Sequence, residues 1–128
     1  MSFVSPELDI QFLKNINPNN HCIYFKFKGK FTEQTALAGT KAWSTFMNEN
    51  PDKSYEFVWD CKEMNGFEIS ARKAWYNTMS AYKDRISKVY VISPNIMIRS
   101  AAKVMLQFFG INSVIGRSEE ELPAAIRI

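Results

Sequence analysis

The sequence predicts an α/β fold in which an N-terminal β-hairpin is followed by βα repeats. Residues 8–13 and 21–28 alternate apolar and polar side chains on either side of a turn-forming segment. Later apolar runs at 55–61, 88–93 and 112–116 each precede a segment with helical character. We therefore expect a mixed, mostly parallel five-stranded sheet with about four helices.

The first helix is expected to follow the hairpin directly. Gly29 to Phe31 end the second strand, and Thr32 is a good N-cap for a helix that runs to about Asn48. Glu33 in its first turn suits the positive end of the helix dipole. This helix should connect the hairpin to the first of the parallel strands.

Three further strand–helix units complete the chain. The strand 55–61 leads through a polar loop, Cys61 to Ile69, into a helix that opens at Ser70 and ends near Ile86. The apolar run 88–93 reads as a buried parallel strand, followed by a helix that Asn95 caps and Gly110 terminates. After the strand 112–116, a Ser118–Glu121 capping box predicts a short C-terminal helix.

Size and composition predict one domain, 1–128, of ordinary globular type. Of its 128 residues 46% are hydrophobic and 23% charged, with a net charge of +3. Lys and Arg are scattered along the chain, which argues against a nucleic-acid partner. Arg99 and Lys103 interrupt the most apolar stretch, 96–115, so no membrane insertion is expected. With no secretory signal at the N-terminus, Cys22 and Cys61 are expected as reduced thiols in the cytoplasm.

The sequence offers little that resembles catalytic machinery. The five glycines are far apart, so no phosphate-binding loop is expected. No zinc-ligand spacing exists, and the single histidine, His21, lies near a turn. Asp60, Glu63 and Glu68 bracket one loop. Either all three are solvated, or two of them form a pair of acid–base carboxylates. We expect no enzyme, no cofactor and no metal.

Asp60 and Ser70 each have two interpretations. Asp60 either hydrogen-bonds the turn that follows it or orients the loop that presents Ser70. Ser70 either caps its helix or carries a phosphate at the positive end of the helix dipole. In the second case Arg72 and Lys73 would offset the added charge, and Glu68 would oppose it.

Taken together, these segments resemble the STAS domain, the fold of sulfate-transporter tails and anti-sigma-factor antagonists, over residues 8–127. The likeness is carried by Lys28-Gly29-Lys30-Phe31, Phe57-Val58-Trp59-Asp60-Cys61 and Met64-Asn65-Gly66-Phe67-Glu68-Ile69-Ser70. The resemblance implies that Ser70 is the hydroxyl that a kinase-type anti-sigma factor phosphorylates. Ile69 stands where the family has Ser or Asp, and Ala71 where it has Gly, so the chain is more similar to divergent bacterial members. The Sec14-like lipid carriers are more distantly related in topology.

Two functions follow as hypotheses, and both leave the oligomeric state open. The first is a regulatory module that binds a protein partner, such as a kinase-like anti-sigma factor or a sensor. Its surface would comprise Asp60, Glu63, Asn65, Gly66, Glu68, Arg72 and Lys73 around Ser70. The alternative is a small apolar-ligand or lipid-binding protein with a pocket between sheet and helices. That pocket would be lined by Phe25, Phe27, Trp43, Phe57, Trp59 and Phe67.

Overall fold

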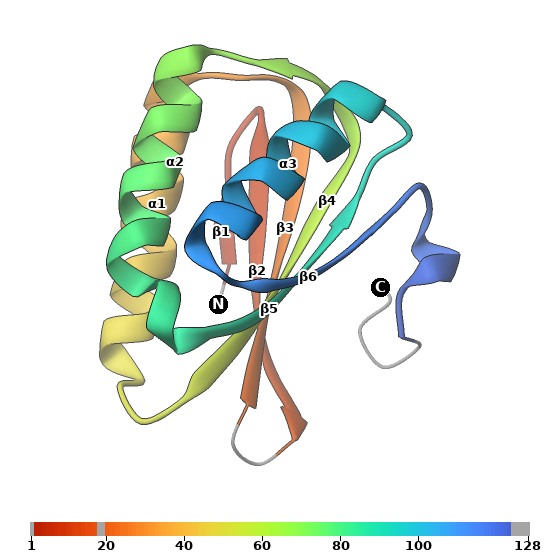
Figure 1. Cartoon of the computed structure of the whole chain (residues 1–128). Coiled ribbons are helices and arrows are strands. Elements are labelled where there is room, and N and C mark those ends of the chain that lie inside the picture. The colour runs from red at the N-terminus through yellow and green to blue at the C-terminus, as the bar shows by residue number, and fades with distance from the viewer. Residues whose placement is uncertain (1, 18–19, 124–128) are drawn as a thin grey trace.

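The computed structural model describes residues 2–17 and 20–123, which form one six-stranded sheet and three α-helices (Figure 1). The strands are β1 (Ser2–Val4), β2 (Leu8–Asn17), β3 (Asn20–Phe31), β4 (Ser54–Phe67), β5 (Ile86–Ile92) and β6 (Asn112–Gly116). The helices are α1 (Glu33–Glu49), α2 (Ile69–Tyr82) and α3 (Ile96–Phe109), with 3₁₀ turns η1 (Lys83–Arg85) and η2 (Glu119–Glu121). The predicted α/β class is confirmed, and β1 is an additional edge strand.

The strands lie in the sheet in the order of the sequence. β1, β2 and β3 pair antiparallel, and β3 to β6 pair parallel, so the predicted hairpin and parallel repeats are both present. Each parallel step is a helical crossover, as parallel neighbours require. The crossovers use α1, then α2 with η1, and finally α3.

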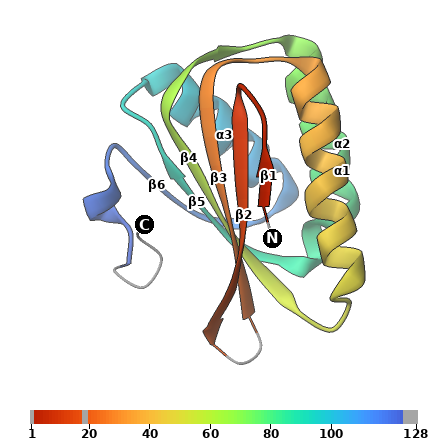
Figure 2. The ribbon, with the colours of Figure 1, turned by 180° about the vertical axis from the view of Figure 1, so that it is seen from behind.

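All three α-helices pack on one face of the sheet, and the two views in Figures 1 and 2 agree on this. The main core between helices and sheet is strongly aromatic. Its fully buried side chains include Phe25, Trp43, Met47, Phe57, Met79 and Leu106. The opposite face carries a smaller apolar cluster of Cys22, Tyr24, Val58, Tyr90, Ile92 and Leu122.

The ends of α1 and α3 follow the local chemistry predicted from the sequence. The Thr32 hydroxyl accepts a hydrogen bond from the Thr35 backbone N–H at 3.4 Å, and Asn95 Oδ1 accepts one from Met97 at 2.8 Å. Gly110 ends α3 with φ of +69°, a left-handed conformation that favours glycine.

The predicted C-terminal helix is a single 3₁₀ turn, η2, within the described residues. The predicted capping box is present there, with Ser118 and Glu121 bonded to each other's backbone. Pro123 disfavours helical backbone at Leu122, whose ψ of 150° is extended, so η2 stops. Any continuation of the predicted helix lies outside the described residues.

The polar loop predicted at 61–69 is wrong, because β4 continues as a strand to Phe67. β3 is long enough to pair with it: Lys28 lies opposite Glu63 and Phe31 opposite Phe67. Register shifts along this pair accommodate the irregular sequence, and Gly29 has φ of +62° there. The extension brings Met64 and Phe67 against the main core.

Candidate functional site: a cavity between the sheet, α2 and α3

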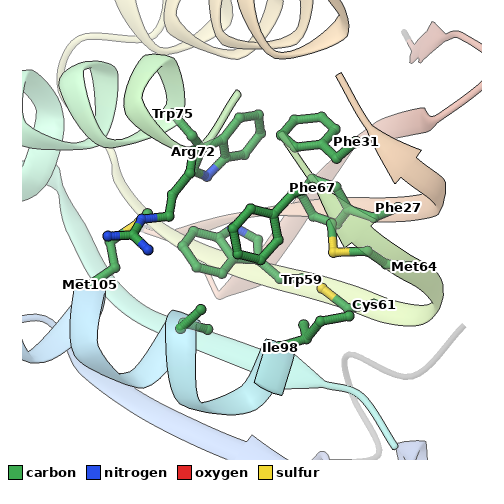
Figure 3. Close-up of a pocket in the computed structure, with 12 residues that line it drawn as sticks. Phe27, Phe31, Trp59, Cys61, Met64, Phe67, Arg72, Trp75, Ile98 and Met105 are labelled. Carbon is green, nitrogen blue, oxygen red and sulfur yellow. The ribbon is translucent and has the colours of Figure 1, made fainter. Parts of the chain in front are cut away.

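An apolar cavity of about 70 Å³ lies between the last residues of β3 and β4, α2 and α3 (Figure 3). A single charged side chain, Arg72, takes part in its wall. The lining residues are Phe27, Phe31, Trp59, Cys61, Met64, Phe67, Arg72, Trp75, Ile98, Ala101, Ala102 and Met105.

The strand wall follows from side-chain alternation. Trp59 and Cys61 are two apart on β4 and therefore point to the same face, toward the helices. Trp75 of α2 packs across the aromatic rings of the neighbouring strand. Its ring centroid lies 5.5 Å from those of Phe27 and Phe31, in edge-on geometry. Such contacts fix the aromatic wall in place.

The α3 wall leaves the empty space. Ile98 and Met105 reach toward the cavity, and between them the lining side chains are the two short ones of Ala101 and Ala102. The C-terminal end of α3 is anchored in the core by Leu106 and Phe109. An alanine pair facing large aromatic side chains thus produces a void in an otherwise close-packed core.

Arg72 marks where the cavity reaches the surface, because its side chain is exposed and yet lines the cavity. In Figure 3 it extends from α2 in the direction of Met105 on α3. Glu68, one helical turn earlier, would be its natural ion-pair partner. The Glu68 carboxylate instead accepts a hydrogen bond from the Glu33 N–H of α1 at 2.8 Å. Within residues 2–17 and 20–123, no salt bridge involves Arg72.

Two polar groups in the wall are buried. The Trp59 indole N–H has no hydrogen-bond partner within the described part of the chain. Burial raises the pKa of the Cys61 thiol far above its usual value, with a smaller contribution from the nearby Asp60 carboxylate. This thiol is therefore protonated at neutral pH, and the cavity is a poor site for nucleophilic chemistry.

The structure brings together half of the aromatic residues predicted to line a pocket. Phe27, Trp59 and Phe67 border the cavity, whereas the others lie beside it in the solid core, namely Phe25, Trp43 and Phe57. Sequence reasoning missed the α3 wall. The core-facing stripe of α3 was visible in the sequence, but its distance from β4 was not.

Asp60 lies on the other face of the sheet, away from the helices. It is buried, and its carboxylate accepts a hydrogen bond from the Tyr24 hydroxyl at 2.9 Å and from the Lys62 N–H at 3.1 Å. The second bond is local, as the first interpretation of Asp60 expected, but Lys62 lies in strand β4 and not in a turn. Burial and the Asp60 carboxylate raise the pKa of Tyr24. Lys62 links this group to Glu119 of η2 through an ion pair.

The remaining predicted surface residues lie on β4 and at the start of α2. Glu63 forms an exposed ion pair with Lys26 at 3.0 Å, and Asn65 and Lys73 are exposed. The capping role predicted for Ser70 is wrong: Glu68 is the N-cap of α2, and Ser70 is an exposed residue inside the first turn. The Glu68 N–H bonds the Phe31 carbonyl at 2.9 Å, which fixes the helix start two residues earlier.

No group of three or more His, Cys, Asp or Glu side chains in the described ranges is placed to hold a metal ion. None of the helices in those ranges has both the length and the apolar character needed to cross a bilayer.

Comparison with known proteins places the chain in a family. Residues 33–127, which include both cavity-lining helices, match the model for the divergent CRAL/TRIO domain. The chain belongs to this family. No curated protein sequence matches it.

Two solved structures share the fold. One is an uncharacterized DUF3478-family protein with a SpoIIAA-like fold from Shewanella loihica PV-4, with a TM-score of 0.68 at 14% identity, covering 93% of this chain and 94% of that one. The other is the anti-sigma factor antagonist SpoIIAA in its unphosphorylated form, with a TM-score of 0.56 at 12% identity, covering 88% and 92%. The likeness to the STAS domain is thereby confirmed as a SpoIIAA-like fold. At these identities it concerns the fold alone.

Proposed function

We propose that this chain is a non-enzymatic binding protein for a small apolar ligand, held between β4, α2 and α3. The observation that carries the proposal is the apolar cavity with one cation at its opening. Ligand sites are concave, mostly apolar and provided with a few polar groups that set orientation. Membership of the divergent CRAL/TRIO family supports a lipid-like ligand, and so does the more distant topological resemblance to the Sec14-like lipid carriers.

The absence of catalysis is part of the same proposal. Cys61 is the one thiol in the cavity wall, and its raised pKa keeps it protonated. Apart from the Arg72 guanidinium, the rest of the wall is aromatic and aliphatic surface. Such a surface can bind an apolar ligand but cannot transfer protons or chemical groups to it.

Native mass spectrometry of the purified chain, paired with tryptophan fluorescence, tests the proposal. Trp59 and Trp75 both line the cavity, so a brominated alkane that enters it should quench their emission. Trp43 is buried outside the lining and gives a constant background. We expect a retained small molecule, or saturable quenching by the bromoalkane. Linear, non-saturating quenching together with a clean apo mass would reject the proposal.

A second candidate is a cytoplasmic regulatory module of STAS type that binds a protein partner and is switched at Ser70. Ser70 is exposed in the first turn of α2, where a phosphate would meet free backbone N–H groups. Arg72 and Lys73 follow it directly. The fold shared with an anti-sigma factor antagonist supports a kinase-like anti-sigma factor or a sensor as partner.

Fragment mass spectrometry on protein from its native cells tests this candidate. Phosphate on Ser70 would support it, and so would a partner that binds the wild-type chain but not Ser70→Glu. Ser80 is exposed on the last turns of the same helix, so Ser80→Glu is a matched control for added charge. An unmodified Ser70 under several growth conditions, with equal partner retention by both variants, would count against the switch.

A further inference from the structure

We infer that the ligand is an amphiphile with a single anionic head group, a carboxylate, which Arg72 binds at the cavity opening while the hydrocarbon tail fills the cavity. The inference rests on the proposed function and names its ligand class. Three features support this ligand: an Arg72 guanidinium without a salt-bridge partner among the described residues, the charges of α2 and α3, and the size of the cavity.

Within the described residues, the Arg72 guanidinium at the opening has no salt-bridge partner. The nearest carboxylate along α2, Glu68, is engaged by the Glu33 N–H. A guanidinium presents paired N–H donors that match the two oxygens of a carboxylate. Because Arg72 also lines the apolar cavity, an anion bound to it would continue into that space.

The charges of the two helices that line the cavity favour an anion over a cation. α2 and α3 together carry four cations, Arg72, Lys73, Arg99 and Lys103, and no acidic residue within their bounds. Arg72 is the one of the four that lines the cavity, whereas the Arg99 guanidinium donates to the Ser93 carbonyl at 2.8 Å. An anionic head group would therefore meet the Arg72 charge directly and the other three at longer range.

The size of the cavity sets the length of the buried tail. An apolar cavity of roughly 150 Å³ suffices for one benzene molecule. At about 70 Å³ this cavity holds about three carbons, the terminal ones of an alkyl tail, and the remaining methylene groups run along the Arg72 side chain to its guanidinium. A linear alkyl carboxylate has this shape, since its head and tail lie in line.

Three octyl compounds with one tail and different head groups test the inference: octanoate, octan-1-ol and octylammonium. Their dissociation constants are measured at neutral pH by calorimetry, or by their displacement of the brominated alkane that quenches the tryptophans. We expect octanoate to bind about tenfold more tightly than octan-1-ol and octylammonium to bind most weakly. Arg72→Gln should remove the octanoate preference, so that octanoate and octan-1-ol bind this variant with similar dissociation constants. Arg72→Lys should keep part of the octanoate preference.

Lys73→Gln is the matched control, because Lys73 is the adjacent exposed cation and does not line the cavity. It should keep the octanoate preference. Equal binding of octanoate and octan-1-ol, or an unchanged preference in Arg72→Gln, overturns the inference while octan-1-ol binding still supports an apolar-ligand protein. Binding of none of the three compounds refutes the proposed function as well. Arg72 is exposed, so its variants should keep the wild-type melting temperature.

Discussion

Filling the cavity from the α3 side should stabilise the protein and abolish ligand binding at the same time. Ala102 is half-buried on α3, lines the cavity and packs against the main core. Ala102→Leu adds three carbons toward the void. Alanine and leucine have similar helix propensities, so the backbone of α3 should not change.

The magnitude follows from the volume of the void. An unfilled cavity costs about 24 cal/mol per Å³. For about 70 Å³ this is about 1.7 kcal/mol, an upper limit because the cavity opens beside Arg72. We therefore expect Ala102→Leu to raise the free energy of unfolding by about 1 kcal/mol, or the melting temperature by about 3 °C.

Urea unfolding measures the stability, and a ligand-dependent melting shift measures the binding. Wild type should melt higher with octan-1-ol, and Ala102→Leu should not respond. Ala74→Leu is the control, because Ala74 is half-buried on α2 outside the cavity lining and its variant should still bind. A loss of more than about 1 kcal/mol in Ala102→Leu would refute the packing argument. A wild-type response to octan-1-ol in that variant would refute the location of the ligand.

Three further predictions concern the framework around the cavity. Glu68→Ala should lower the free energy of unfolding by about 1 kcal/mol, because the Glu33 N–H loses its acceptor. Glu68→Gln keeps an acceptor and should lose less stability in the same urea assay. Equal losses in the two variants would contradict a stabilising role for the Glu33–Glu68 hydrogen bond. The pKa of Glu7 is lowered, chiefly by the Thr32 hydroxyl, which donates to it at 2.5 Å. The folded pKa of Glu7 lies below its unfolded pKa, so its stabilisation is fully present above the unfolded pKa and is lost as pH falls through the folded pKa. Stability curves of wild type and Glu7→Gln should therefore converge in acid, and parallel curves would disprove this. Cys61 should resist iodoacetamide at pH 8 in the native state and react on unfolding, because burial raises its pKa; rapid native labelling would show the wall to be open.

Much of the fold could be predicted because its signals are local. Within the run 88–93, the four residues Val89 to Ile92 form an unbroken apolar stretch, which is typical of a strand buried on both faces. Asn95 and Gly110 delimit α3 through their own backbone and side-chain preferences. The alternation in 8–13 and 21–28 gives the hairpin with its faces in the correct register.

The wrong predictions lie where segments distant in the sequence determine the local structure. Residues 62–67 form a strand because the end of β3 supplies hydrogen-bonding partners, and their own sequence has no regular alternation. The start of α2 is set by the bond between Glu68 and Phe31, so the hydroxyl of Ser70 misled the prediction. The cavity depends on Ala101 facing aromatic side chains from another part of the chain. A cavity of this kind leaves no recognisable pattern in the sequence.

The hydrogen bond from Glu33 to Glu68 has a consequence for how ligand size can diverge within the family. This bond joins the start of α1 to the start of α2, so the helix α2 that carries part of the aromatic wall is fixed relative to α1. The α3 side of the cavity comes from a segment, 96–109, that lies between its caps Asn95 and Gly110. Substitutions in that single segment can resize the cavity without altering the joined starts of α1 and α2. We therefore expect relatives with the same scaffold to differ in the sequence of α3 and, with it, in the size of the ligand that fits the cavity.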